Sequence, residues 1–243
     1  MNSGRHERDK SFDGLACPEL LKDAGFSRCS FRDVSFADAV IEQVEFSECE
    51  FRLCSFSSAS LLECTFSQCS FYDPDTERGL SFRFAKLQGT EFSGCDLTLC
   101  DLSRSNIYQS RFHNSQLSGA DLSHSSAEHP VAGSVVLRGV DFSDCNLAYA
   151  DLSHGRLQEA DFSGSRLNHA LMDELDLTDA SLNDCELHNI SGAGILLRGA
   201  DLRGCNLSGL DLRLIDMEGV RINLEQARGL LETLGMIIDD GAT

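Results

Sequence analysis

Residues 24–71 read AGFSRCSFRDVSFADAVIEQVEFSECEFRLCSFSSASLLECTFSQCSF, and every fifth residue of this stretch is large and apolar. The large residues are Phe26, Phe31, Phe36, Ile41, Phe46, Phe51, Phe56, Leu61, Phe66 and Phe71. Two residues before each lies a small or β-branched residue, namely Ala24, Cys29, Val34, Ala39, Val44, Cys49, Cys54, Ala59, Cys64 and Cys69. A period of five fits neither the 3.6 of an α-helix nor the alternation of a strand. The stretch therefore indicates a repeat architecture.

The same period continues through most of the chain. It resumes one step out of phase at Phe82, and after a second break it runs from Leu137 through Phe142 to Ile222. A square coil of four five-residue sides places one large residue at the centre of each side and one small residue near each corner. Residues twenty apart then stack at the ~4.8 Å spacing of paired strands. We therefore predict an all-β solenoid over residues 24–222.

This pattern resembles the pentapeptide-repeat family, whose consensus is A(D/N)Lxx. Close matches are Ala120-Asp121-Leu122, Ala150-Asp151-Leu152, Ala160-Asp161-Phe162 and Ala200-Asp201-Leu202. The resemblance covers residues 24–222 and implies a right-handed quadrilateral β-helix.

Two breaks interrupt the repeat, and each contains a proline. Proline cannot donate to a strand ladder, so it favours loops and edges. The breaks predict loops at about 72–79 and 126–139. Loops on a rigid scaffold often bind partners, although a tolerated insertion without function stays open. The candidate partner-binding residues are Tyr72, Asp73, Pro74, Asp75, Thr76, Glu77, Arg78 and Gly79 in the first loop, and Glu128, His129, Pro130 and Val131 in the second.

The two ends of the chain depart from the period. Residues 1–23 are interpreted as a tail and cap, with residues 1–10 disordered. After Ile222 the apolar spacing becomes helical, so residues 223–243 predict a short helix and a tail. A solenoid end needs a cap, and a simple cap is one interpretation. The other is a dimer interface formed by Leu224, Ala227, Leu230, Leu231, Leu234, Met236 and Ile237.

The 11 cysteines do not suggest a metal site. All but Cys17 lie on the small inward position, where a free cysteine behaves as a small hydrophobe. Zinc ligands usually cluster at short spacings such as CxxC, and none is present. No metal or cofactor is expected. The histidines follow the outward positions of the repeat, and no nucleophile elbow or phosphate-binding loop occurs, so we predict that the protein is not an enzyme.

The chain is strongly acidic, with 20 Lys and Arg against 39 Asp and Glu and a net charge of −19. A well-solvated surface is one interpretation. The other is a polyanionic rod that imitates DNA, which has one charge per ~1.7 Å. Direct nucleic-acid binding is disfavoured because no basic footprint stands out, and a DNA-binding protein is the more natural partner. No apolar run is long enough to cross a membrane, and the first ten residues lack a secretory apolar region. The expected location is cytoplasmic.

A closer resemblance is to the Qnr quinolone-resistance proteins. It rests on Phe71-Tyr72-Asp73 followed by a polar stretch to Gly79, and on the ending from Asp211 to Gly235. The resemblance implies binding to DNA gyrase, with topoisomerase IV as a further target, protection from quinolones or another topoisomerase poison, and end-to-end homodimers. Protection would come from loop contacts, from DNA mimicry, or from both. The amino-terminal part is about one coil longer than usual, and the second loop is small and polar. The alternative is a structural or adaptor protein with an unrelated partner.

Overall fold

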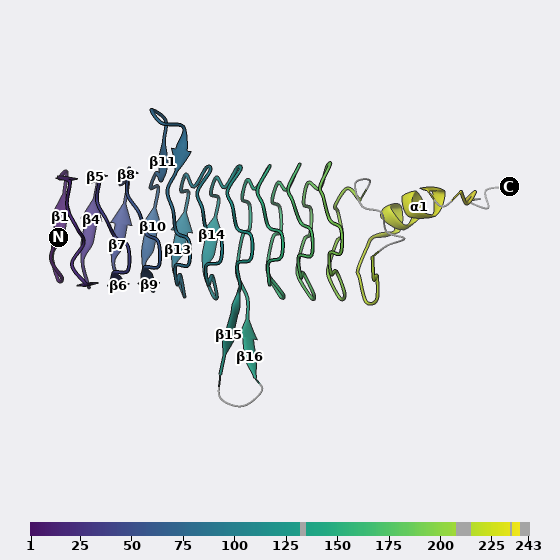
Figure 1. Cartoon of the computed structure of the whole chain (residues 1–243). Coiled ribbons are helices and arrows are strands. Elements are labelled where there is room, and N and C mark those ends of the chain that lie inside the picture. Colours follow the sequence, from purple (N-terminus) through teal and green to yellow (C-terminus); the bar gives the residue numbers. More distant parts are fainter. Residues whose placement is uncertain (132–134, 208–214, 234, 239–243) are drawn as a thin grey trace.

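The chain is a rod of stacked four-sided coils that ends in one α-helix (Figure 1). The computed structural model describes residues 1–131, 135–207, 215–233 and 235–238. This architecture confirms the predicted β-solenoid with a short C-terminal helix, α1 (Leu224–Thr233).

Parallel strands line successive coils. The longest sheet contains β1 (His6–Arg8), β4 (Gly25–Ser27), β7 (Glu45–Ser47), β10 (Thr65–Ser67), β13 (Glu91–Ser93) and β14 (Arg111–His113). Two shorter sheets contain β2 (Ser11–Asp13), β5 (Ser30–Arg32) and β8 (Glu50–Arg52), and β3 (Leu20–Lys22), β6 (Val40–Glu42) and β9 (Ser60–Leu62). Isolated parallel bridges such as Asp141↔Asp161 and Asp201↔Arg221 continue the ladders toward the C-terminus.

The central apolar residues form four columns, one behind each side of the rod. We name the sides by these columns: face A (Phe26, Phe46, Phe66, Phe92, Phe112, Phe142, Phe162), face B (Phe31, Phe51, Phe71, Leu97, Leu117, Leu147), face C (Phe36, Phe56, Phe82, Leu102, Leu122, Leu152) and face D (Ile41, Leu61, Leu87, Ile107, Ala127, Leu157). All of these side chains are buried. The corners between faces are named by the two letters they join.

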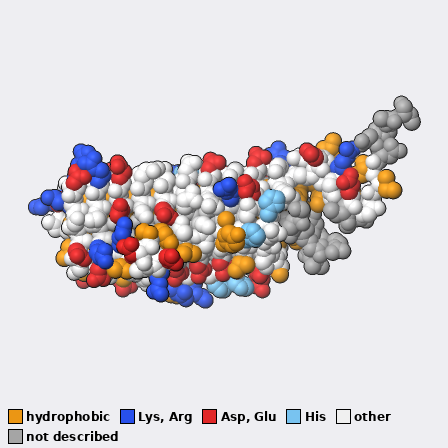
Figure 2. Space-filling view, turned by 90° about the horizontal axis from the view of Figure 1, so that it is seen from above, with side chains coloured by type: hydrophobic (Ala, Val, Ile, Leu, Met, Phe, Trp, Pro, Cys, Tyr) orange, Lys and Arg blue, Asp and Glu red, His pale blue; other side chains and the backbone are white. Residues whose placement is uncertain are grey.

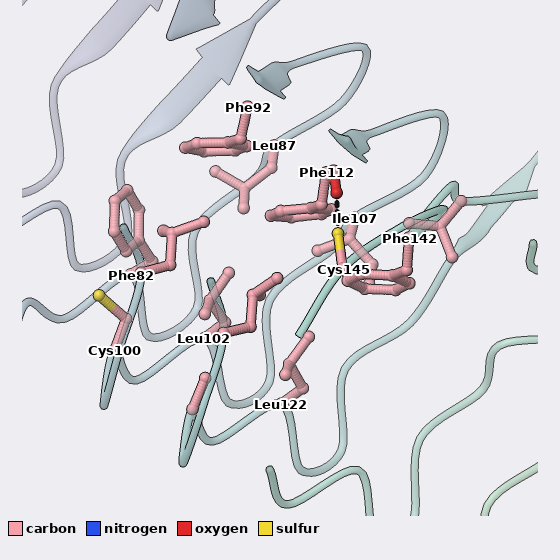
Figure 3. Packing of buried hydrophobic residues seen from close by; sticks show 14 of the residues in the cluster. Phe82, Leu87, Phe92, Cys100, Leu102, Ile107, Phe112, Leu122, Phe142 and Cys145 are labelled. Atoms are coloured by element: carbon pink, nitrogen blue, oxygen red, sulfur yellow. Dashed lines mark hydrogen bonds between the residues drawn. The ribbon is translucent and has the colours of Figure 1, made fainter. Parts of the chain in front are cut away.

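Face A shows why the repeat is stable. Phe92, Phe112 and Phe142 lie one over another (Figure 3), with ring centroids 4.9 Å and 4.8 Å apart and nearly parallel planes. The backbone sets this spacing, because the Phe112 N–H donates to the Asp141 carbonyl at 2.7 Å in the next coil. Each stacked pair contributes about 0.5–1.5 kcal/mol beyond burial.

Except where the two breaks in the repeat leave the coil, the corners are typically made by a residue with a left-handed backbone, two positions after a central residue. Examples are Phe84 (φ 60°), His124 (φ 57°) and Tyr149 (φ 62°). This conformation costs roughly 1–2 kcal/mol for a residue with a Cβ, and the ladder bonds on both sides offset it. Because the corner side chains point outward, they form ridges along the rod.

The first coil begins earlier than the sequence suggests. Residues 6–22 form β1, β2 and β3, which pair with β4, β5 and β6, so residues 1–10 are not disordered and the segment is not merely a tail. Glu7 lies beside Phe26, nineteen residues away, whereas Leu21 lies beside Ile41. One residue is thus missing from this coil, and Glu7 holds a position that is elsewhere large and apolar. The missing residue and the polar Glu7 together explain why the period of five is not visible in residues 1–23.

The cysteines and the helix complete the core. Ten cysteines are buried and free, as predicted, and Cys17 is half-buried. Their thiols donate to backbone carbonyls, as Cys145 does to Phe112 (Figure 3). At the far end, Asn223 and Gln226 bond each other reciprocally, and the Gln226 amide donates to the carbonyls of Leu202 (2.6 Å) and Cys205 (2.8 Å). This capping box joins α1 to the last coils.

Candidate functional site

The two loops leave the rod on opposite sides (Figure 1). The first connects Phe71 of face B to Phe82 of face C, so it projects from the B–C corner. The second connects Ala127 of face D to Phe142 of face A, so it projects from the D–A corner. These corners are diagonally opposed. The structure therefore does not bring the two sets of candidate partner-binding residues together into one site.

The first loop is a short hairpin of β11 (Tyr72–Asp73) and β12 (Arg78–Gly79). Asp73 is buried and its Oδ1 accepts the Asp75 N–H at 3.0 Å, while Arg52 of the preceding coil lies 3.4 Å from Asp75. A Cβ at Gly79 would lie 2.3 Å from the backbone of Leu99 and Cys100. The hairpin base is thus packed tightly on the coil.

The tip of this hairpin is open to solvent. Pro74, Asp75, Thr76, Glu77 and Arg78 are all exposed. Because the base is fixed and the tip is exposed, the first loop can present its charges to a partner from a defined position.

The second loop is a hairpin of β15 (Glu128–Pro130) and β16 (Val136–Arg138). His129 stacks on buried Tyr108 with ring centroids 5.2 Å apart, and the Asn106 amide donates to the Glu128 carbonyl at 3.0 Å. The Glu128 carboxylate lies 3.5 Å from both Arg138 and Arg156. Glu128 and His129 therefore anchor the hairpin, while Pro130 is exposed and Val131 is half-buried.

The sequence misplaces one residue of this loop. Leu137, predicted to be a central inward residue, lies in β16 and is 44% exposed, and the inward position of that coil belongs to Ala127 instead. The extra length of the second break is a multiple of five, so the period alone cannot distinguish the two. Val135 is 55% exposed on the same hairpin. The second loop thus displays apolar side chains, and its interpretation as small and polar misses them.

The C-terminal candidate residues are partly exposed. Leu224 and Ile237 are 88% and 97% exposed, and Met236 and Leu231 are also open to solvent. Leu230 packs in part against the core, and Ala227 is half-buried. Leu234 lies outside the described residues. The exposed apolar side chains are available for a contact beyond this chain.

Charge is spread unevenly along the rod. Residues 140–205 contain 12 acidic and 4 basic side chains, whereas residues 72–139 contain 8 acidic and 6 basic ones. Figure 2 shows both kinds on one face of the rod. The polyanionic character is therefore strongest in the C-terminal half, and the part that bears the loops is closer to neutral.

Neither a metal centre nor a membrane span is present in the described part of the chain. No group of three or more metal-ligating side chains comes together there. Among the same residues, no helix is long and apolar enough to cross a bilayer.

Comparison with known proteins identifies the repeat. The family model described as "Pentapeptide repeats" matches residues 35–73, 78–114, 134–164, 156–191 and 193–227. No curated protein matches the sequence.

Solved structures show the same fold. Full-length QnrB1, described as a plasmid-mediated fluoroquinolone resistance protein, superposes with a TM-score of 0.67 at 20% identity, over 95% of this chain and 100% of that one. A trypsin-treated variant of QnrB1 gives 0.66 at 22% identity, over 94% and 98%. The likeness covers nearly the full length of both chains. The family model also matches more than half of the chain's residues, and the chain therefore belongs to the pentapeptide-repeat family.

Proposed function

We propose that the protein binds DNA gyrase, and the related topoisomerase IV, and protects the enzyme from quinolones or another topoisomerase poison. The rod is similar to QnrB1 over nearly its whole length, and that protein's description names fluoroquinolone resistance. The proposal places the protein in the cytoplasm with its partner.

The observation that carries the proposal is that the first loop is an appendage. Phe71 and Phe82 are eleven positions apart, and removing residues 73–78 would restore the spacing of five. Gly79 would then take the left-handed corner position, and buried Leu80 already occupies an inward one. Because the repeat closes without these six residues, the exposed charges of Asp75, Glu77 and Arg78 and the tight packing of the hairpin base favour a role in binding.

We favour a mechanism in which the loops make the decisive contacts. The loops project from opposite corners, so a partner that touches both must extend around half of the rod. An enzyme with a channel or saddle for DNA has such a shape. The acidic C-terminal half supports a second contribution from DNA mimicry.

The proposal includes an end-to-end homodimer. Leu224, Met236 and Ile237 expose apolar surface at the end of the rod, and a second copy is the simplest cover for it. A dimer would place the two acidic halves next to each other.

Binding to purified gyrase is the first test. The protein should retain gyrase in a pull-down, and deletion of residues 73–78 or of residues 129–138 should each weaken retention. The second deletion keeps Glu128 and likewise restores the period. Failure of the intact protein to retain gyrase would remove the proposal in favour of an unrelated partner.

A further inference from the structure

One corner of the rod differs in charge from the rest. At the C–D corner, the three outward positions of five successive coils, from Ser57 to Arg156, contain no acidic residue. They contain the basic corner, which we define as Arg83, Phe84, Lys86, Arg104, His124 and Arg156, and otherwise Ser, Asn and His154. With coils ~4.8 Å apart, the basic corner is about 15–20 Å long.

The contrast with the other corners is marked. Over the same coils the A–B corner has Asp96 and Asp144, and the D–A corner has Glu91 and Glu159. In a chain of net charge −19, a basic strip of this length is not expected from composition. The strip also ends abruptly, since the next coil places Glu174 on the ridge that His124 occupies.

Two cations of the basic corner, Lys86 and Arg104, have no ion-pair partner among the described residues, and a third, Arg83, is only loosely paired. Lys86 and Arg104 are exposed, and neither side chain makes a hydrogen bond or ion pair within the described part of the chain. The Arg83 guanidinium donates to Ser103 at 3.2 Å and lies 5.1 Å from the ring centre of Phe84. Its nearest carboxylate, Asp101, is 4.0 Å away, so that ion pair is loose.

Phe84 is the exposed aromatic residue of this strip. Phe84 is 52% exposed and has the left-handed backbone of a corner residue, and the equivalent corner position one coil earlier is occupied by Ser58. Aromatic side chains, Phe among them, and Arg are enriched at protein–protein interfaces relative to the rest of the protein surface.

The basic corner lies between the two loops. Arg83 follows directly after Phe82, where the first loop rejoins the coil, and faces C and D separate the corner from the two loops. Arg156 lies 3.5 Å from Glu128 at the base of the second loop. A partner that reaches around the rod from one loop to the other on this side must cross the basic corner.

We propose that the basic corner binds an acidic segment of a protein partner. The proposal deepens the proposed function, in which that partner is a type II topoisomerase. Charge complementarity supports it: a peptide can place carboxylates against Lys86 and Arg104 and leave neutral residues elsewhere.

Nucleic acid fits this corner less well. A row of aspartates, Asp101, Asp121 and Asp151, runs along face C beside it. A duplex presents one phosphate charge per ~1.7 Å without interruption, so its backbone would meet these carboxylates.

A peptide-binding assay tests the corner alone. The probes are a fluorescein-labelled 12-residue peptide of alternating Glu and Gly, and labelled DNA of 12 nucleotides and of 12 base pairs. The test variant is R83S/K86S/R104S, because Ser occupies equivalent positions in neighbouring coils. The control variant R111S/R166S/R198S removes three cations from other corners and changes the net charge equally.

Fluorescence anisotropy at low salt should show that the peptide binds. We expect about tenfold weaker binding by the test variant, since three exposed ion pairs are lost, and little change in the control. Equal losses in both variants, no peptide binding by the intact protein, or tighter binding of either DNA would each overturn the proposal.

A crosslinking assay then asks whether the partner is the proposed one. The chain has three lysines, Lys10, Lys22 and Lys86, and the first two lie in the first coil. In a complex with gyrase, zero-length carbodiimide crosslinking should join Lys86, and not the other two, to carboxylates of the enzyme. A gyrase complex in which Lys86 forms no crosslink contradicts the inference. If gyrase is not bound at all, the proposed function fails, while the peptide assay still decides the basic corner.

Discussion

Replacing Phe112 by Ala should destabilise the rod at its middle. Phe112 is fully buried and stacks on two rings, with centroid distances of 4.9 Å to Phe92 and 4.8 Å to Phe142. The Ala variant would lose both stacking contacts. A Phe-to-Ala change in a core costs about 3–5 kcal/mol. We expect the upper half of this range, because ladder bonds on both sides of Phe112 hold the coils apart and the cavity cannot collapse.

The matched control is Phe84→Ala, the same substitution at an outward corner. Phe84 is 52% exposed and loses only its contact with Arg83, so the cost should stay below about 1 kcal/mol. Urea unfolding followed by circular dichroism measures both. A Phe112→Ala variant that loses less than about 1 kcal/mol, or as little as the control, would refute the argument from stacked columns.

Three further predictions concern the loop, the thiols and the C-terminus. Gly79→Ala should displace the first hairpin, weaken gyrase binding and lower the urea midpoint, because the added Cβ would meet backbone atoms of Leu99 and Cys100, whereas Gly229→Ala, where an added Cβ meets open space, should do none of these; equal binding by both variants would contradict this. Burial raises the pKa of the Cys54 and Cys64 thiols from an ordinary value of 9.0 to about 11. Neutral thiols therefore contribute stability that is complete below pH 9 and is lost as the pH rises toward 11, so the urea midpoint should fall over this window, and less so in C54A/C64A. Deleting residues 224–243 should convert a dimer to monomers in light scattering, and an intact protein that is monomeric at micromolar concentration would count against the interface.

The period of five predicts the columns well, because the side-chain size at each central position is set by the coil itself. The period of five fails to identify central residues where a coil is shorter than twenty residues or carries an insertion. The first coil is one residue short and has Glu7 at a central position, so the period does not reveal its strands. Leu137 keeps the period inside the second hairpin although its side chain faces outward. Both errors arise because spacing alone cannot distinguish a residue in a coil from one in an insertion or a shortened turn.

The sites are less predictable than the fold. Both loops are visible as breaks around Pro74 and Pro130, and their anchoring by Gly79 and Tyr108 depends on contacts between coils. That they project from opposite corners follows only once each central residue is assigned to a face. The basic corner likewise becomes visible only after each central residue has been assigned to a face, because Arg83, Lys86 and Arg104 come together only when the chain is wound into four sides.

The most direct test of the account is gyrase supercoiling in the presence of ciprofloxacin, with the intact protein, the variant lacking residues 73–78, and a variant with Asp201, Asp211 and Asp216 neutralised. Asp211 lies outside the described residues, so this third variant rests on the sequence. The account predicts that the intact protein restores supercoiling, that the loop deletion abolishes the relief while retaining the fold, and that the charge variant has a milder effect that is sensitive to salt. Equal relief by all three would contradict both mechanisms, and no relief by the intact protein would contradict the assignment to gyrase.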